Sequence, residues 1–171
     1  HWCPRCSTAL AQNYEIVYKK LRESSIYVKF PLKGKDNEYL IIWTTTPWTI
    51  PYNLAVMAHP KEDYVRVRTN GEVWILAKEG LDHLLPEKNY EILEEFKGKD
   101  IEGLAYWHPF ITEIQKLQEM KEEWAFKVIL SEEYVDVKTG SGLVHSAPGC
   151  GPEDFEVGQR YGLPPFNTVD E

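Results

Sequence analysis

The chain has 171 residues, of which 43% are hydrophobic and 13% aromatic, and its formal net charge is -8. This length and apolar content suit one compact soluble domain, residues 1–171, which we expect to be part of a longer chain because it begins with His1 rather than Met. No apolar run reaches the length of a membrane span, and no signal peptide is apparent. The negative charge argues against a free-standing nucleic-acid-binding protein, whose affinity comes mainly from Lys and Arg contacts to phosphates.

Strand patterns dominate the sequence. In chain order, β-branched and aromatic residues predict strands over 14–19, 25–30, 39–43, 54–58, 64–68, 72–77, 90–96, 124–130 and 143–145. Asn70-Gly71 predicts a hairpin turn between two of them. Helices are predicted over 78–85, 112–123 and 152–161. Because strands and helices do not alternate, we predict a mainly β fold with a largely antiparallel, barrel-like or sandwich core and peripheral helices.

A pair of cysteines lies at the start of the chain, in Cys3-Pro4-Arg5-Cys6. This spacing lets two thiolates bind one zinc ion, but structural zinc normally takes four protein ligands. The third cysteine, Cys150, is far along the chain, and no second pair of this kind exists. The sequence therefore predicts either half of a zinc site or two inert thiols. Such sparse thiols suit a reducing environment, so we expect a cytoplasmic protein.

A threonine-rich segment directly follows the predicted strand at 39–43, where residues 44–53 read TTTPWTIPYN. Thr44, Thr45 and Thr46 cannot all face a core, so at least two of them must present hydroxyl or amide groups elsewhere. The prolines fix φ and make the loop rigid. A rigid, donor-rich loop at a strand end is typical of a binding pocket, although a plain turn rich in Thr and Pro is the alternative.

A second segment, residues 140–158, reads GSGLVHSAPGCGPEDFEVG. Gly140 and Gly142 let the chain turn before a strand that carries His145, and a Pro- and Gly-rich loop then opens a helix with Asp154 in its first turn. A carboxylate at that position can cap the helix or pair with the ammonium group of an amino acid. His145 alone could be structural. Neither a Ser-His-Asp nor a Cys-His nucleophile set is evident.

These segments resemble parts of one known family. Residues 44–60, TTTPWTIPYNLAVMAHP, are similar to the threonine-rich segment of the editing domain of isoleucyl-tRNA synthetases. Residues 140–158 resemble the other half of that site, and residues 1–12, HWCPRCSTALAQ, resemble the junction with the catalytic body. Valyl and leucyl relatives usually carry Arg where this chain has Thr46 and an acidic residue where it has Trp48, so the isoleucyl branch is favoured.

The resemblance implies hydrolysis of valine misattached to tRNA(Ile), after and possibly before its transfer to the tRNA. It also implies roles for individual residues: Thr44, Thr45 and Thr46 hold the ester and the terminal adenosine, Asp154 anchors the ammonium group, Trp48 and Asn53 are further pocket positions, and His145 limits the size of the side chain that enters. Thr44, Thr45, Thr46 and Asp154 form the expected catalytic set.

The expected partners are the 3′ end of mischarged Val-tRNA(Ile) and the catalytic body in the same chain, with the domain itself a monomer. No cofactor is expected within residues 1–171. By resemblance, zinc held partly by Cys3 and Cys6, and ATP with Mg²⁺, belong to the full-length synthetase. The activation motifs HIGH and KMSKS are absent, so aminoacylation is not expected. The alternatives are a valyl-type editing domain, a non-catalytic tRNA-docking insertion and, with a complete metal site, a zinc hydrolase.

Overall fold

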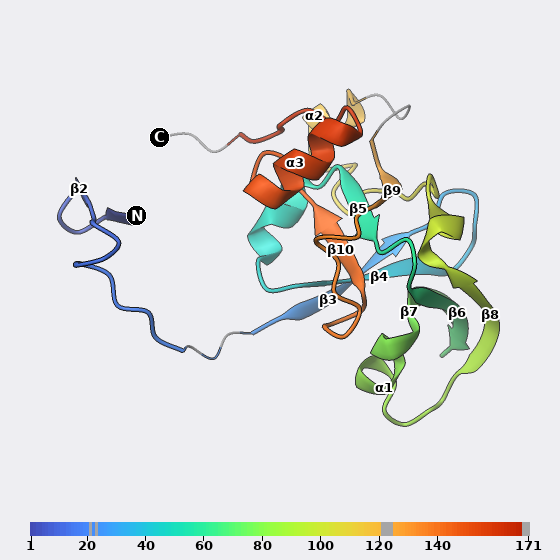
Figure 1. Ribbon diagram of the computed structural model, residues 1–171. Coiled ribbons are helices and arrows are strands. Elements are labelled where there is room, and N and C mark those ends of the chain that lie inside the picture. The colour runs from blue at the N-terminus through green and yellow to red at the C-terminus, as the bar shows by residue number, and fades with distance from the viewer. Residues whose placement is uncertain (21, 23, 121–124, 169–171) are drawn as a thin grey trace.

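The computed structural model describes residues 1–20, 22, 24–120 and 125–168 (Figure 1). The strands are β1 (Trp2–Cys3), β2 (Thr8–Ala9), β3 (Ile26–Pro31), β4 (Glu38–Thr44), β5 (Ala55–Ala58), β6 (Asp63–Thr69), β7 (Glu72–Ala77), β8 (Glu91–Lys97), β9 (Lys127–Leu130) and β10 (Leu143–Ser146). The α-helices are α1 (Leu81–Leu84), α2 (Gln115–Gln118) and α3 (Pro152–Arg160), and the 3₁₀ turns are η1 (Pro47–Tyr52), η2 (Lys78–Gly80) and η3 (Gly98–Ile101). Among the described residues, no helix is long and apolar enough to cross a membrane.

The strands form a five-stranded sheet in the order β3-β4-β7-β6-β8, a three-stranded sheet in the order β10-β5-β9, and a small β1-β2 ribbon. The ribbon lies apart from the two sheets in Figure 1. The predicted mainly β, largely antiparallel fold is confirmed, with parallel pairing only of β4 with β7 and of β5 with β9 among the described strands. These strands close no barrel, so of the two predicted core types the sandwich is closer.

Strand β4 is the central element because both of its faces are buried. Leu40 and Ile42 belong to the main core, which also takes in the three-stranded sheet, whereas Ile41 lies in a second cluster with Leu76 and Leu81 beneath α1. A strand covered on both sides reads as a continuous apolar run rather than an alternating one. This explains the uninterrupted run that precedes the threonines, and it fixes Thr44 at the end of a rigid strand.

The turn before β10 packs closely on the large sheet. Gly140 has φ +66°, and a Cβ atom there would lie 2.4 Å from Cγ of Trp43. The hydroxyl of Tyr64, from β6, donates to the carbonyl of Gly142 at 2.7 Å and accepts from the amide of His59 at 2.9 Å. These contacts hold the start of β10 against the strand that ends at Thr44.

Most predicted strands and turns are present. Asn70 and Gly71 have φ of 49° and 79°, the left-handed pair that a type I′ hairpin turn requires, and β6 pairs with β7 around them. The strands predicted over 25–30, 39–43, 54–58, 64–68, 72–77, 90–96 and 143–145 are confirmed with small shifts at their ends. The one predicted over 124–130 forms at Lys127–Leu130, and residue 124 lies outside the described residues.

Two predicted elements are wrong in form. Residues 14–19 form no strand, and Tyr14 and Val17 are 92% and 78% exposed. The alternating pattern finds no neighbouring strand there, and a strand without a hydrogen-bonding partner has little stability. The helix predicted over 112–123 is the single turn α2, with residues 121–123 outside the described residues, although Leu117 is buried as its spacing suggests.

The two remaining predicted helices are present. Residues 78–85 form η2 followed by α1, and residues 152–161 form α3. Pro152 occupies the first turn of α3. An N–H at this position has no acceptor inside the helix, so its absence in Pro costs nothing.

We predict that Gly140→Ala lowers the free energy of unfolding by about 2–4 kcal/mol, because Ala disfavours positive φ and its Cβ would overlap the Trp43 ring. Gly34→Ala is the matched control, since Gly34 has φ +71° and nothing within 4 Å of the added atom. Urea unfolding of both variants measures the difference. Equal losses would mean that the contact with Trp43 contributes nothing.

Candidate functional site

The threonine segment separates into one buried and two exposed hydroxyl groups. Thr44 is 6% exposed, and its Oγ1 accepts the backbone N–H of Thr46 at 3.0 Å. Thr45 and Thr46 are exposed. The buried hydroxyl therefore shapes the loop, while the other two can reach a ligand. This agrees with the prediction that at least two of the three threonines face away from the core.

The loop continues into η1, which brings a further threonine beside the segment. Thr49 Oγ1 donates to the carbonyl of Thr46 at 2.8 Å, and the hydroxyls of Thr46 and Thr49 lie 3.4 Å apart. In a 3₁₀ turn, residues three positions apart lie above one another, so the i,i+3 spacing of these threonines could have revealed this contact. Trp48 is 69% exposed, so its ring is not a core residue.

His145 connects the threonine segment to β10. Its Nε2 lies 3.1 Å from Thr49 Oγ1, across 96 residues of sequence. Because the Thr49 hydroxyl donates to Thr46, it accepts from His145, and we assign the proton of the ring to Nε2. Nδ1 is buried with no hydrogen-bond partner among the described residues, and burial lowers the pKa of His145 to about 4. The imidazole is therefore neutral at pH 7.

Asp154 is the third residue of α3, and its carboxylate lies close to Ala147, the residue directly after β10. Burial raises the pKa of its carboxyl to about 6, hydrogen bonding from the Ala147 backbone opposes this, and the charge of Glu153 adds to it. No Lys or Arg is among the groups that shift the pKa of Asp154.

The capping alternative for Asp154 receives no support from the helix terminus. The cap position of α3 is Gly151, and no side-chain capping hydrogen bond is formed. Asp154 is thus a partly buried carboxylate without a positive partner. Such a group destabilises the fold and is well suited to bind a cation.

We predict that Asp154→Asn raises the free energy of unfolding at about pH 7.5 by about 1–2 kcal/mol, a value reduced for partial exposure. The folded pKa lies above the unfolded one, so the cost of the ionised carboxylate is full above about pH 6 and disappears below about pH 4. Urea unfolding at both pH values checks this, with exposed Asp82→Asn, in the first turn of α1, as control. A helix cap would instead make the variant less stable at neutral pH.

Asn53 lies behind the site rather than in it. It is 0% exposed, its Nδ2 donates to the carbonyls of Ala55 at 2.7 Å and Ser146 at 3.4 Å, and its Oδ1 accepts from Tyr106 Oη at 2.5 Å. This corrects the expectation that Asn53 contacts the substrate. Its amide joins η1, β5, β10 and the segment that contains Tyr106, a link for which the sequence carries no local signal.

The cysteines do not form a metal centre by themselves. Hydrogen bonds from the backbone and side chain of Cys6 lower the pKa of Cys3, and both lie on the exposed ribbon. Within the described residues, no group of three or more His, Cys, Asp or Glu could hold a metal ion. Cys3 and Cys6 fit half of a zinc site, and the rest of that expectation stays a prediction. Partial burial, and then the charge of Asp154, raise the pKa of Cys150, so its thiol is not activated.

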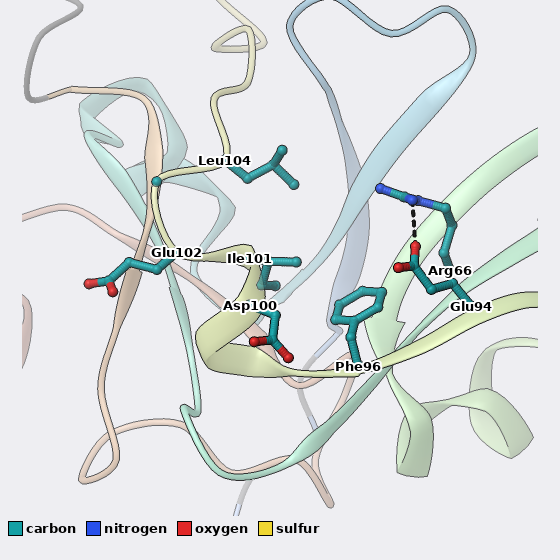
Figure 2. Close-up of a pocket in the computed structure, with 8 residues that line it drawn as sticks. Arg66, Glu94, Phe96, Asp100, Ile101, Glu102 and Leu104 are labelled. Atoms are coloured by element: carbon teal, nitrogen blue, oxygen red, sulfur yellow. Dashed lines mark hydrogen bonds and ion pairs between the residues drawn. The ribbon is translucent and has the colours of Figure 1, made fainter.

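A cavity of about 390 Å³ lies elsewhere, between β6, β8 and η3 (Figure 2). Its lining residues are Arg66, Glu94, Phe96, Asp100, Ile101, Glu102, Gly103 and Leu104. Arg66 is already paired, with Glu94 at 2.6 Å and with Glu38 at 3.4 Å. Glu38 begins β4 and Thr44 ends it, which separates the two regions by about 20 Å at the usual rise of a strand. None of the predicted site residues lines this cavity.

Comparisons with solved structures identify the fold. The leucyl-tRNA synthetase structure GlLeuRS-CP1 superposes with a TM-score of 0.64 at 17% identity, covering 83% of this chain and 66% of that one. The editing domain of the cytosolic leucyl-tRNA synthetase of P. knowlesi gives 0.57 at 14% identity, covering 81% and 62%. The fold is therefore that of a synthetase editing domain.

Comparisons with curated proteins narrow the class, although no family model matches the chain. The isoleucine–tRNA ligase of Pyrococcus abyssi is 55% identical over 181 residues, and that of Methanocaldococcus jannaschii is 45% identical over 185. Each alignment covers 100% of this chain, which spans 17% and 18% of those relatives. The chain belongs to the isoleucyl-tRNA synthetase family and corresponds to its editing domain.

Proposed function

We propose that this domain hydrolyses valine wrongly esterified to tRNA(Ile). The observation that carries the proposal is the carboxylate of Asp154, partly buried, with a pKa raised to about 6 and no cationic partner among the described residues. The α-ammonium group of an aminoacyl ester is a cation of suitable size. Its binding would offset the cost of burying the carboxylate, so substrate binding and relief of that cost occur together.

The other residues of the site fit an aminoacyl-adenosine end. The exposed hydroxyls of Thr45 and Thr46 can hydrogen-bond to the ester and the terminal ribose. The indole of Trp48, 69% exposed beside them, offers an aromatic face on which a base can stack. The net charge of -8 is unfavourable for holding a tRNA by its phosphates, so the rest of the synthetase supplies most of that affinity.

A hydrolase with a threonine nucleophile is the competing mechanism, because Thr49 and His145 lie within hydrogen-bond distance. The direction of the bond argues against it. Thr49 donates its proton to the Thr46 carbonyl, so His145 Nε2 donates to Thr49 and cannot remove its proton. His145 Nδ1 also has no carboxylate to orient it among the described residues.

We therefore propose that water attacks the ester carbonyl, with a hydroxyl of the terminal adenosine assisting. The protein contributes orientation, through Asp154 and the threonine segment, and a fixed polar environment. A separate editing site is needed because one methylene in an apolar pocket gives only about 1–3 kcal/mol of discrimination, an effect for which isoleucyl-tRNA synthetases are themselves the standard example.

The test is deacylation of Val-tRNA(Ile) by the wild-type chain and by Asp154→Asn. Losing one charge-assisted hydrogen bond removes about 1.5–3 kcal/mol, so kcat/KM should fall roughly 10- to 100-fold in the variant. In the wild type, kcat/KM should fall as the pH drops through about 6, because the carboxylate must be ionised to pair with the ammonium.

Wild-type activity in a folded Asp154→Asn variant would show that Asp154 does not bind the substrate. A wild-type chain that binds Val-tRNA(Ile) without cleaving it would identify a tRNA-docking insertion, and preference for Thr-tRNA(Val) would identify a valyl-type editing domain.

His145 has two separable roles in this proposal, as a wall that excludes isoleucine and as a tether of Thr49. We predict that His145→Ala gains hydrolysis of correctly charged Ile-tRNA(Ile), because it opens room for the extra methylene. Thr49→Val removes the same hydrogen bond but leaves the wall in place. It should slow valine hydrolysis without admitting isoleucine. Deacylation of both charged tRNAs by both variants measures this, and isoleucine release by Thr49→Val as well would assign the size limit to the loop.

A further inference from the structure

We propose that His108 is a positioning residue of this site, which holds η1 and thereby Trp48 and Thr49 in place. The inference rests on the proposed function of the site. His108 lies in the segment between β8 and β9 and is 1% exposed, and the hydrogen bonds of its ring go to Ile50 and Phe110. It acts on the site through the backbone of η1.

The hydrogen bonds of His108 define its orientation. The backbone N–H of Phe110 donates to Nδ1 at 3.0 Å, so Nδ1 is the acceptor and Nε2 carries the proton. Nε2–H then donates to the carbonyl of Ile50 at 3.0 Å. The ring centroids of Phe110 and Phe126 lie 6.1 and 5.6 Å from the centroid of the imidazole, and the two rings restrict its rotation. The donor is therefore fixed before any substrate arrives.

The turn η1 lacks one hydrogen bond of its own backbone ladder, and a tether from outside compensates for it. Pro51 has no N–H, so one donor of this short 3₁₀ ladder is missing, whereas Pro47 stands in the first turn, where an N–H has no partner inside the helix. The amide of Thr49 bonds to the Thr46 carbonyl, and that of Asn53 bonds to the same Ile50 carbonyl that His108 holds. The side chains of His108 and His145 add restraint from outside the turn.

The two tethers act on neighbouring residues from different elements. His145, on β10, holds the side chain of Thr49, and His108 holds the carbonyl of the next residue, Ile50. Both rings are neutral, because burial lowers each pKa to about 4. Each histidine therefore gives one N–H to η1, and a positive charge is absent from both near neutral pH.

The test compares His108→Met, which fills the space without a donor, with His108→Gln, whose amide can still reach the Ile50 carbonyl. The variants are made in the full-length protein and assayed on Val-tRNA(Ile), with exposed His83→Leu as control. We expect His108→Met to lower kcat about tenfold while KM changes less than threefold, because Asp154 still binds the ammonium. His108→Gln should recover kcat to within about threefold of the wild type.

A second readout does not depend on activity. The indole ¹H–¹⁵N resonance of Trp48 should shift in His108→Met and stay in place in His108→Gln and in His83→Leu. If His108→Met does not fold, His108→Leu takes its place in both measurements. Wild-type kcat in the folded apolar variant, equal slowing in His108→Gln, or an unmoved Trp48 resonance would each overturn the inference. A wild-type protein without deacylation would instead overturn the proposed function, and the Trp48 resonance would then decide the role of His108 in positioning η1.

Discussion

The arrangement of the site depends on one fully buried amide. Asn53 makes hydrogen bonds through both ends of its side chain, to Ala55 and Ser146 on one side and Tyr106 on the other. A buried polar group left without a partner costs about 1–3 kcal/mol, so these segments cannot shift relative to one another without a penalty. The amide thus fixes the register of β5 against β10 and the end of η1 at once. Thr49 in η1 and His145 in β10 depend on it for their positions.

Hydrogen-bond satisfaction differs between Asn53 and His108 and the residues of the site. Asn53 and His108 have partners for all of their side-chain polar groups, whereas His145 has one ring nitrogen without a partner among the described residues. The Asp154 carboxylate accepts from the Ala147 backbone, but burial disfavours its ionised form and no Lys or Arg is among the groups that shift its pKa. Natural proteins rarely keep buried polar groups without full partners unless a ligand binds them. This difference therefore distinguishes the scaffold residues from the site residues.

The sequence predicts most strands because their periodicity is local, and it predicts the two site segments because their glycines, prolines and hydroxyls have few other uses. It does not predict the links between them. The bond of Thr49 to His145 spans 96 residues, and that of Asn53 to Tyr106 spans 53, so neither leaves a pattern in a short window. The burial of Asn53 was missed for this reason, as was the role of His108. Residues 14–19 are the opposite case. Their local pattern predicts a strand, but no neighbouring strand pairs with them.

The two halves of the site, the threonine segment and the segment of β10 and α3, are far apart in the sequence, and this sets an order of assembly. The five-stranded sheet is made from residues 26–97 and can pair before the rest of the chain exists, but η1 gains its tethers only when His108 and β10 dock on it. Contacts of such long sequence separation form late and open early. A nascent or partly opened chain would thus keep its large sheet yet lack an assembled site, so the site would be lost at a milder stress than the fold.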